Sequence, residues 1–143
     1  FSPSAGLFYT YARDAADIYY KRDDEYEEGD IFLGGYGEEA DHPENFTAAI
    51  RALSPLTGDL TWEYPLDPTS NFRAGILTTA GGLLFSGSGD GYFFALDDRT
   101  GEDLWHISVG GAVHAAPMTY GVDGRQYVTV SANHALFTFA LPD

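Results

Sequence analysis

The sequence of 143 residues contains no cysteine, which excludes disulfide bonds, thiolate metal ligands and a cysteine nucleophile within this chain. Basic residues are scarce as well, at 7 Lys and Arg against 22 Asp and Glu, and the formal net charge is −15. A chain this acidic lacks the basic surface that nucleic-acid binding requires, so no nucleic-acid partner is expected. No apolar run approaches the roughly 20 residues of a membrane-spanning helix, so no membrane span is expected.

The composition favours an all-β protein, because typical helix formers such as Lys, Gln and Met are few while aromatic residues reach 15% and glycines number 17. Short apolar runs alternate with turn-forming pairs such as Gly-Gly, Asp-Gly and Thr-Gly. Hairpin turns are expected at 89–91 and 122–125. The expected strands are 7–11, 31–34, 48–53, 60–64, 75–79, 83–86, 92–96, 103–109, 113–119, 126–131 and 136–141.

An internal repeat is the most informative pattern in the sequence. Residues 52–62 and 95–105 share Ala, Leu, Thr, Gly and Trp at a constant offset of 43 residues, and a truncated third copy begins at 138–143. A period near 43 with about four short strands in each unit is typical of a β-propeller blade. The chain holds about three such periods, fewer than the four blades of the smallest closed ring, so the sequence predicts part of a larger propeller.

The repeated motif has a mechanical interpretation. Thr-Gly predicts a tight turn in which glycine adopts a backbone conformation that costs other residues energy. Trp62 and Trp105 follow this turn on the outer strand, where each ring can lie against a neighbouring blade, and the small Ala at the start of the motif leaves room for it. A ligand-stacking role for the two tryptophans is the alternative. Repetition at a fixed spacing favours the scaffold role.

The second copy carries Ala95, Asp97, Thr100, Gly101 and Trp105, and this pattern resembles the tryptophan-docking motif of the pyrroloquinoline quinone (PQQ) dependent alcohol dehydrogenases, or quinoproteins. The first copy departs from the pattern once, because Ser54 stands in the Asp position, and a weaker motif hydrogen bond is expected there. The wider sequence is similar to C-terminal segments of the same family. These segments are 4–9, 49–53, 79–87, 116–120 and the ending 139–142.

The resemblance implies a fold and an activity. It implies an eight-bladed propeller of four-stranded antiparallel sheets that holds PQQ and a Ca²⁺ or lanthanide ion on its axis. It implies oxidation of a small alcohol to an aldehyde, with electrons passing to a c-type cytochrome or another quinone, in the periplasm. Residues 1–143 would form the C-terminal portion of this single domain and would need the rest of the propeller, which would also account for the start at Phe1 and the lack of a visible signal peptide.

The resemblance places the catalytic base, the metal ligands and an adjacent-cysteine disulfide upstream of this chain. No catalytic or metal-binding residue is therefore assigned here, and the chain alone is expected to be inactive. One loop, 71–75, resembles a loop that often contains Trp-Gly-Gly in the family and reaches the PQQ pocket. The resemblance implies that Asn71 hydrogen-bonds the polar edge of the quinone and that Phe72 contacts its rim. The structural alternative is an Asn turn beside a buried Phe.

Other candidate sites are weaker. The four histidines, at positions 42, 106, 114 and 134, lack the spacing of metal ligands. His114 could face a propeller axis, although a surface or core position is the favoured interpretation. Residues 86–91 lack the alternating acids of a calcium loop and favour a hairpin.

Residues 13–47 interrupt the repeat and hold 12 acids against 3 basic residues. Four tyrosines among them predict that this insertion packs partly against the protein. The favoured interpretation is a solvated inter-strand insertion that aids solubility. The alternative is a docking surface for a basic, electron-accepting cytochrome.

A second class of protein fits the repeat. A non-catalytic propeller built from PQQ-like repeats would use the same blades as a scaffold for protein–protein interaction. The segments 79–82 and 116–120 favour the dehydrogenase, because the resemblance to the scaffold class covers the repeat and not those stretches.

Overall fold

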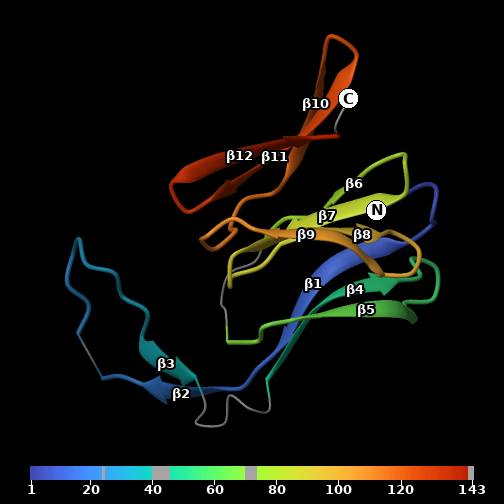
Figure 1. The fold of residues 1–143 in the computed structure, drawn as a ribbon. Coiled ribbons are helices and arrows are strands. Elements are labelled where there is room, and N and C mark those ends of the chain that lie inside the picture. Colours follow the sequence, from blue (N-terminus) through green and yellow to red (C-terminus); the bar gives the residue numbers. More distant parts are fainter. Residues whose placement is uncertain (24, 40–45, 70–73, 142–143) are drawn as a thin grey trace.

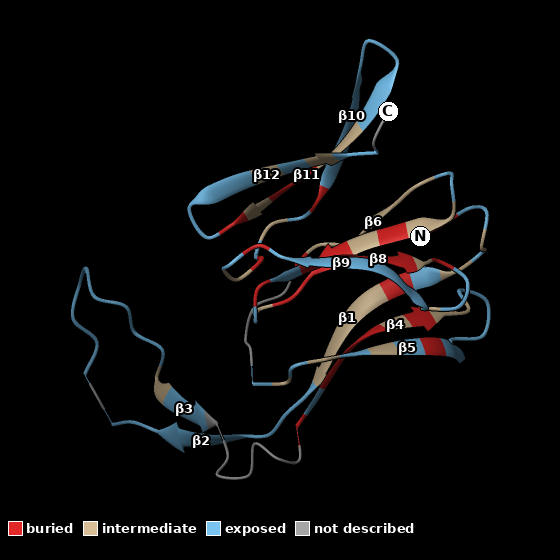
Figure 2. Ribbon diagram, in the orientation of Figure 1, coloured by how far each residue is buried: buried red, intermediate tan, exposed pale blue. Residues whose placement is uncertain are grey.

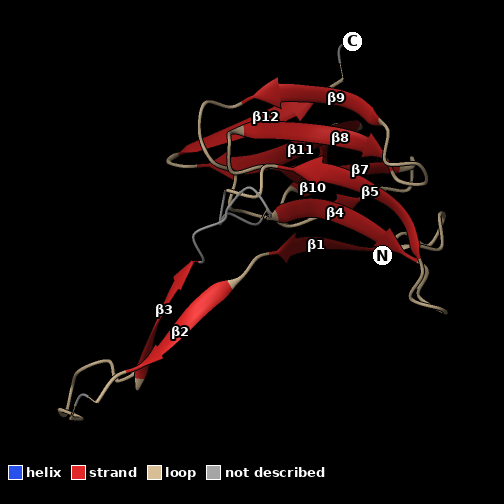
Figure 3. Cartoon of the chain, turned by 90° about the horizontal axis from the view of Figure 1, so that it is seen from below, coloured by secondary structure: helices blue, strands red, loops and turns tan. Residues whose placement is uncertain are grey.

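The computed structural model describes residues 1–23, 25–39, 46–69 and 74–141, and every regular element in these ranges is a β-strand (Figure 1, Figure 3). The all-β prediction is therefore confirmed. No helix long and apolar enough to cross a bilayer occurs in the described part of the chain.

Three antiparallel sheets lie one beside the next, in the order of the chain (Figure 1). The first contains β1 (Phe8–Asp14), β4 (Thr47–Leu53) and β5 (Leu60–Leu66). The central, four-stranded sheet contains β6 (Leu77–Thr78), β7 (Leu83–Gly87), β8 (Tyr92–Asp97) and β9 (Asp103–Ser108). The third contains β10 (Met118–Val122), β11 (Arg125–Ala132) and β12 (Ala135–Ala140). In the central and third sheets each strand pairs with the next along the chain, and in the first sheet β1 pairs with β4 across the intervening β2 and β3, which gives antiparallel sheets like those of a propeller blade.

Strand β8 of the central sheet is buried along most of its length, which explains its nearly continuous apolar sequence. Phe94 and Leu96 of β8 join a core shared with the first sheet, where Tyr9 and Ile50 lie. Phe93, on the opposite face of the same strand, joins a second core with residues of the third sheet. Alternate residues of β8 therefore pack against the two neighbouring sheets. Most of β8 is accordingly buried (Figure 2).

The expected hairpin turns are confirmed. Residues 88–91 connect β7 to β8, with the amide of Gly91 donating to the carbonyl of Ser88. The turn at 122–125 joins β10 to β11 in continuous register, with Val122 opposite Arg125.

One expected strand, 31–34, is wrong. This part of the chain lies in the loop between β2 (Asp17–Lys21) and β3 (Gly35–Glu39), and it is these two strands that pair, with Tyr20 opposite Tyr36. The apolar run 31–33 has high strand propensity but pairs with none of the described strands, and the positive φ of 65° at Gly34 ends its extended backbone.

Two further strands have other bounds than expected. The strand expected over 113–119 begins only at Met118, because Pro117 has no N–H to donate to a sheet, and Val113 forms only an isolated bridge to Ala132. The strand expected over 75–79 is reduced to the two residues of β6.

The hairpin of β2 and β3 projects from the first sheet between β1 and β4 as an arm (Figure 1, Figure 3). All five residues of β2 are exposed, and Tyr19, Tyr26 and Tyr36 are each more than half exposed. The expectation that these tyrosines pack partly against the protein is therefore wrong. The ring contact of Tyr26 is with Phe32 of the same arm, so local aromatic pairing replaces contact with the sheets.

Candidate functional site

The two residues assigned to the cofactor by resemblance, Asn71 and Phe72, lie outside the described residues. Described residues lie on both sides of this loop. On one side, the Asp67 Oδ1 atom accepts hydrogen bonds from the amide and the hydroxyl of Thr69, at 2.8 and 2.7 Å. On the other side, Ala74 is buried in the core between the central and third sheets. The cofactor role of Asn71 and Phe72 stays a prediction.

Trp62 joins the first sheet to the central sheet. It lies on β5 opposite Ala52 of β4, which is fully buried and small enough to leave room for the indole. The indole covers the turn of the next repeat: a Cβ atom placed on Gly101 would lie 2.6 Å from the Trp62 ring. The Trp62 Nε1–H donates to the carbonyl oxygen of Asp98 at 3.3 Å. The predicted scaffold role of Trp62 is confirmed.

Trp105 repeats this arrangement one sheet further along. It lies opposite Ala95, and in both copies the strand register shifts directly after the Ala. Its ring meets the edge of Phe139 of β12 at a centroid distance of 5.3 Å. Trp105 is 39% exposed, against 8% for Trp62, because among the described residues no third copy of the Thr-Gly turn covers it. Its contact with the third sheet agrees with the scaffold role.

The turns of the two motif copies have the same backbone hydrogen bond but differ in one side chain. The amides of Gly58 and Gly101 donate to the carbonyls of Ser54 and Asp97 at 2.8 and 2.9 Å. The Asp97 Oδ1 atom then accepts three further hydrogen bonds, from the amides of Arg99 and Thr100 and the Thr100 hydroxyl. These bonds, that from Arg99 first, hold the pKa of the Asp97 carboxyl below its usual value.

Ser54 accepts one long hydrogen bond in the same position, from the amide of Thr57 at 3.4 Å. The expectation of a weaker motif hydrogen bond in the first copy is confirmed.

Asp98 is a residue that the sequence did not single out, and it is the centre of the contact between the first two sheets. It is fully buried. Its carbonyl oxygen accepts from the hydroxyl of Tyr9 at 2.7 Å as well as from Trp62, and its Oδ2 accepts from the hydroxyl of Ser2 at 2.6 Å. Its Oδ1 has no hydrogen-bond partner among the residues that the structure describes. Burial, and then the charge of Asp98, raise the pKa of the Tyr9 phenol to about 12.

The repeated motif includes Asp97, but no sequence signal marks the neighbouring Asp98 as the buried acid. The two acids are adjacent, and only the packing of the first sheet against the turn buries the second.

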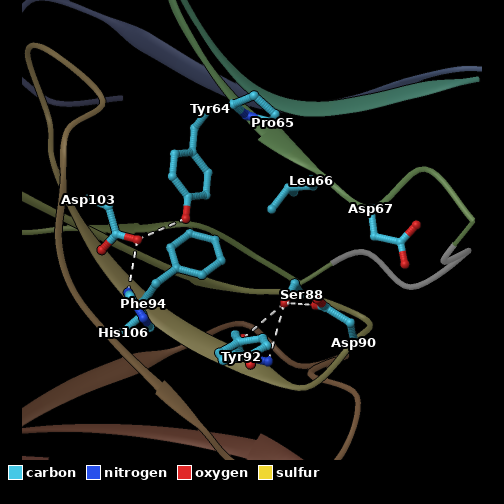
Figure 4. Close-up of a pocket in the computed structure, with 10 residues that line it drawn as sticks. All are labelled: Tyr64, Pro65, Leu66, Asp67, Ser88, Asp90, Tyr92, Phe94, Asp103 and His106. Atoms are coloured by element: carbon cyan, nitrogen blue, oxygen red, sulfur yellow. Dashed lines mark hydrogen bonds and ion pairs between the residues drawn. The ribbon is translucent and has the colours of Figure 1, made fainter.

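A cavity of about 310 Å³ opens between the first and central sheets (Figure 4). Aromatic, acidic and polar side chains from β5, the β7–β8 turn, β8 and β9 surround it: Tyr64, Pro65, Leu66, Asp67, Ser88, Asp90, Tyr92, Phe94, Asp103 and His106. No pattern in the sequence indicates this cavity, because its walls come from segments that are far apart along the chain.

A short hydrogen-bond chain crosses one wall of this cavity (Figure 4). The Tyr64 hydroxyl donates to the Asp103 Oδ2 atom at 3.1 Å, and His106 Nδ1 lies 3.1 Å from the same oxygen. Burial, and then the hydrogen bond and charge of Asp103, raise the pKa of Tyr64 to about 12. Tyr64 is therefore a neutral hydrogen-bond donor at physiological pH.

This cavity does not fit the cofactor that the resemblance implies, and the described residues form no metal site. PQQ carries carboxylate groups, and the cavity presents Asp67, Asp90 and Asp103, whose charges would repel it. No group of three His, Asp or Glu side chains in the described ranges is placed to hold a metal ion. The described part of the chain therefore supplies blades and their docking contacts, and no chemical step is assigned to its residues.

Comparisons with known proteins agree with this architecture. Residues 65–128 match the family model "Glucose/ethanol/alcohol dehydrogenase, beta-propeller domain". The chain is 35% identical over 135 residues to a quinoprotein ethanol dehydrogenase of Pseudomonas putida, covering 94% of this chain and 21% of that protein. It is 47% identical over 85 residues to a lupanine 17-hydroxylase (cytochrome c) of a Pseudomonas species, covering 54% of this chain and 12% of the relative.

Two solved structures share the fold. A quinohemoprotein alcohol dehydrogenase of Pseudomonas putida superposes with a TM-score of 0.82 at 30% identity, over 95% of this chain and 21% of that one. A europium-containing methanol dehydrogenase superposes with a TM-score of 0.80 at 31% identity, over 91% and 23%. The chain thus spans about a fifth of the length of the relatives that it matches.

The adjacent antiparallel sheets, with an indole of one docked on the Thr-Gly turn of the next, define part of a β-propeller with tryptophan-docked blades. The predicted partial propeller is confirmed. The chain belongs to the PQQ-dependent (quinoprotein) alcohol dehydrogenase family.

Proposed function

We propose that this chain is part of a PQQ-dependent dehydrogenase that oxidises small alcohols to aldehydes. The observation that carries the proposal is the match to a quinoprotein ethanol dehydrogenase along 94% of this chain. Since the chain spans 21% of that relative, the activity belongs to a longer protein of which these blades would be the C-terminal part. Within it, residues 1–143 would be one portion of a single domain, with 13–47 as an acidic insertion and with motifs at 52–62, 95–105 and 138–143.

The described residues support this function by holding blades in register. Trp62, Gly101 and Asp98 fix the first sheet to the central one, and Trp105 fixes the central sheet to the third. Blades that cannot shift against one another would keep loops at the end of the sheets in fixed positions. Among these loops we place Asn71 and Phe72 at the edge of the PQQ site, with the Ca²⁺ or lanthanide ion bound by residues outside this chain.

The electron acceptor and the cellular compartment are part of the same proposal. We expect a c-type cytochrome or a quinone as the acceptor and a periplasmic location, as the family resemblance implies. Relatives of this chain bear the names quinohemoprotein alcohol dehydrogenase and lupanine 17-hydroxylase (cytochrome c), which fits a haem acceptor.

The acidic arm of β2 and β3 is exposed, which fits the interpretation of a solvated insertion. Docking of a basic cytochrome on the arm is the alternative. If that alternative holds, the association rate of the cytochrome falls steeply with salt, whereas a flat salt response excludes it.

The decisive experiment uses the intact protein that contains this chain. After reconstitution with PQQ and either Ca²⁺ or a lanthanide, dye-linked oxidation of ethanol and 1-butanol is expected, with none in the absence of PQQ. Residues 1–143 alone, under the same conditions, are expected to be inactive. Absence of PQQ binding by the intact protein would overturn the proposal, and activity of the isolated chain would overturn the assignment of the catalytic residues to the remainder.

The role of Asn71 and Phe72 is tested separately. Phe72→Ala and Asn71→Ala are expected to reduce PQQ retained after gel filtration, measured by the absorbance of the bound quinone. Asp59→Asn, in the turn between β4 and β5, serves as the control. If both variants retain as much PQQ as the control, the two residues do not contact the cofactor.

The second candidate, a non-catalytic scaffold propeller, is not favoured. The relatives named above, at 30% identity or more, are dehydrogenases or a hydroxylase by name.

A further inference from the structure

The sequence contains two Asp-Gly pairs, and both lie in hairpin turns. Asp90–Gly91 lies between β7 and β8, and Asp123–Gly124 lies between β10 and β11. In such a pair the main-chain amide nitrogen of glycine can attack the carboxyl carbon of the preceding aspartate, because glycine has no Cβ atom to hinder the approach. The structure gives the two pairs different surroundings, so their reactivity should differ.

The Asp123–Gly124 pair is open to solvent. It lies at the tip of the β10–β11 hairpin, which projects beyond the other two sheets (Figure 1), and residues 121–126 are all exposed. A Cβ atom placed on Gly124 would meet no other atom within 4 Å. Among the described residues, no hydrogen bond reaches the Gly124 amide or the Asp123 carboxylate. The two groups that would react are therefore not held by other parts of the protein.

The backbone of this turn is strained at Asp123. The φ angles of Asp123 and Gly124 are 50° and 80°, and a two-residue type I′ turn requires positive φ at both positions. Glycine adopts such angles freely, whereas a residue with a Cβ atom does so at a cost of about 1–2 kcal/mol. A main chain that is one carbon longer at Asp123 is no longer confined to this conformation.

The Asp90–Gly91 pair is held in place. Gly91 is buried, and its amide donates to the Ser88 carbonyl at 3.3 Å. The Ser88 hydroxyl donates to the Asp90 carboxylate. A Cβ atom on Gly91 would lie 3.1 Å from the amide nitrogen of Gly111, so the turn also packs closely against the loop after β9. Ring closure at Asp90 would have to break these contacts, whereas an exposed turn without them opens at little cost.

We propose that Asp123 is a site of spontaneous isoaspartate formation and that the fold protects Asp90 from the same reaction. The Gly124 nitrogen forms a bond to the Asp123 carboxyl carbon, and the carboxyl hydroxyl leaves with the amide proton as water, which closes a succinimide ring. Water then opens the ring. Cleavage at the side-chain carbonyl restores aspartate, and cleavage at the main-chain carbonyl leaves isoaspartate, with the chain continuing through the side chain.

No oxidant or cofactor takes part in this reaction, and the site does not depend on the proposed dehydrogenase function. The product carries an additional methylene in the main chain between Val122 and Arg125, which pair directly across the hairpin. Isoaspartate therefore changes the register of β10 and β11 at the tip of the hairpin.

Peptide mapping of the intact protein tests the proposal. Trypsin cleaves after Arg73, Arg99 and Arg125, so the two pairs fall in separate peptides, 74–99 and 100–125. After incubation of the folded protein at neutral pH, the isoaspartate fraction at Asp123 is expected to exceed that at Asp90 at least tenfold. Mass spectrometry with electron-transfer fragmentation distinguishes isoaspartate from aspartate, and the succinimide is lighter by one water. A sample digested before incubation gives the background.

The same protein unfolded in guanidinium chloride serves as the control for the effect of the fold, because both pairs should then react at similar rates. Two variants identify the chemistry. Asp123→Asn should speed isoaspartate formation, since ammonia replaces water as the leaving group, and Asn-Gly suits the same turn. Asp123→Glu keeps the charge but cannot close the five-membered ring, so no modification is expected at this position.

An isoaspartate fraction at Asp123 that is no greater than that at Asp90 in the folded protein would overturn the proposal. An unchanged ratio between the two sites after unfolding would overturn the protective role of the fold. Neither result bears on PQQ binding or alcohol oxidation, so this proposal and the proposed function fail independently.

Discussion

The indole Nε1–H of Trp62 donates to the main-chain carbonyl of Asp98 at 3.3 Å, across 36 positions of sequence and from one sheet to the next. The same carbonyl accepts from Tyr9, so two aromatic side chains of the first sheet converge on one turn of the central sheet. This convergence connects the repeat in the sequence to the stacking of blades in space. It also identifies the residues at which the stacking can be tested.

Replacing Trp62 should weaken the docking of the first sheet. Trp62→Ala removes a nearly buried ring and is expected to lower the free energy of unfolding by about 3–5 kcal/mol. Trp62→Phe keeps part of the ring but loses the hydrogen bond, and a loss of about 1–2 kcal/mol is expected. Urea unfolding followed by far-ultraviolet circular dichroism measures both. Trp105→Ala should cost less than Trp62→Ala, because Trp105 is 39% exposed; an equal or larger cost would contradict the docking model.

Alanine substitutions at Gly58 and Gly101 separate the cost of backbone strain from the cost of a close contact with a neighbouring ring. Both have a positive φ, of 79° and 74°, but a Cβ on Gly58 meets nothing within 4 Å whereas one on Gly101 meets the Trp62 ring at 2.6 Å. Gly58→Ala should therefore cost only the backbone strain, about 1–2 kcal/mol. Gly101→Ala adds the displacement of the indole, for a total of about 2–4 kcal/mol. Equal losses of stability in thermal or urea unfolding would show that the indole does not constrain this turn.

The difference between Ser54 and Asp97 predicts a stabilising substitution. Ser54→Asp should reproduce the three hydrogen bonds that Asp97 accepts and raise the free energy of unfolding by about 0.5–1 kcal/mol at pH 7. The folded-state pKa of such a carboxyl is depressed, so its contribution is present above the usual Asp pKa near 4 and is lost as the pH falls through the lower folded value.

Urea unfolding of the wild type, Ser54→Asp and Asp97→Asn between pH 7 and pH 3 tests this substitution. Asp97→Asn should be less stable than the wild type at pH 7. The difference between their free energies of unfolding should become smaller as the pH falls. If the difference in the free energy of unfolding stays constant with pH, the charged form of Asp97 is not its cause.

The raised pKa of Tyr9 predicts that the protein loses stability at high pH. Its folded pKa of about 12 exceeds the usual value of 10.0, so the folded state retains a proton that the unfolded state releases. The stabilisation is complete below pH 10 and is lost as the pH rises from about 10 to 12. Since a phenolate can neither donate to the Asp98 carbonyl nor tolerate its carboxylate, Tyr9→Phe should be less stable at pH 8 but show a shallower decline above pH 10. Parallel declines in the two proteins, measured by chemical unfolding, would contradict this.

The repeat made much of the fold predictable. The pairs Ala52–Trp62 and Ala95–Trp105 lie opposite each other across their hairpins, as the fixed spacing and the Thr-Gly turn require. Local rules failed where pairing depends on a distant partner. The run 31–33 has strand propensity but pairs with none of the described strands, and three tyrosines of the arm are more than half exposed in the part of the chain that the structure describes.

The sequence by itself determined the class of fold, the period of the blades and the indole contacts, because these depend on turn chemistry and on a spacing that recurs along the chain. Only the tertiary structure decided that Asp98 rather than Asp97 is buried, and that Tyr64, Asp90, Asp103 and His106 surround one cavity. Burial and cavity formation depend on how two neighbouring sheets pack against each other. The residues that meet in this packing have no regular spacing in the sequence. The absence of cysteine and the scarcity of basic residues fit a chain whose blades are fastened by indole rings and whose cavity between blades is lined by carboxylates.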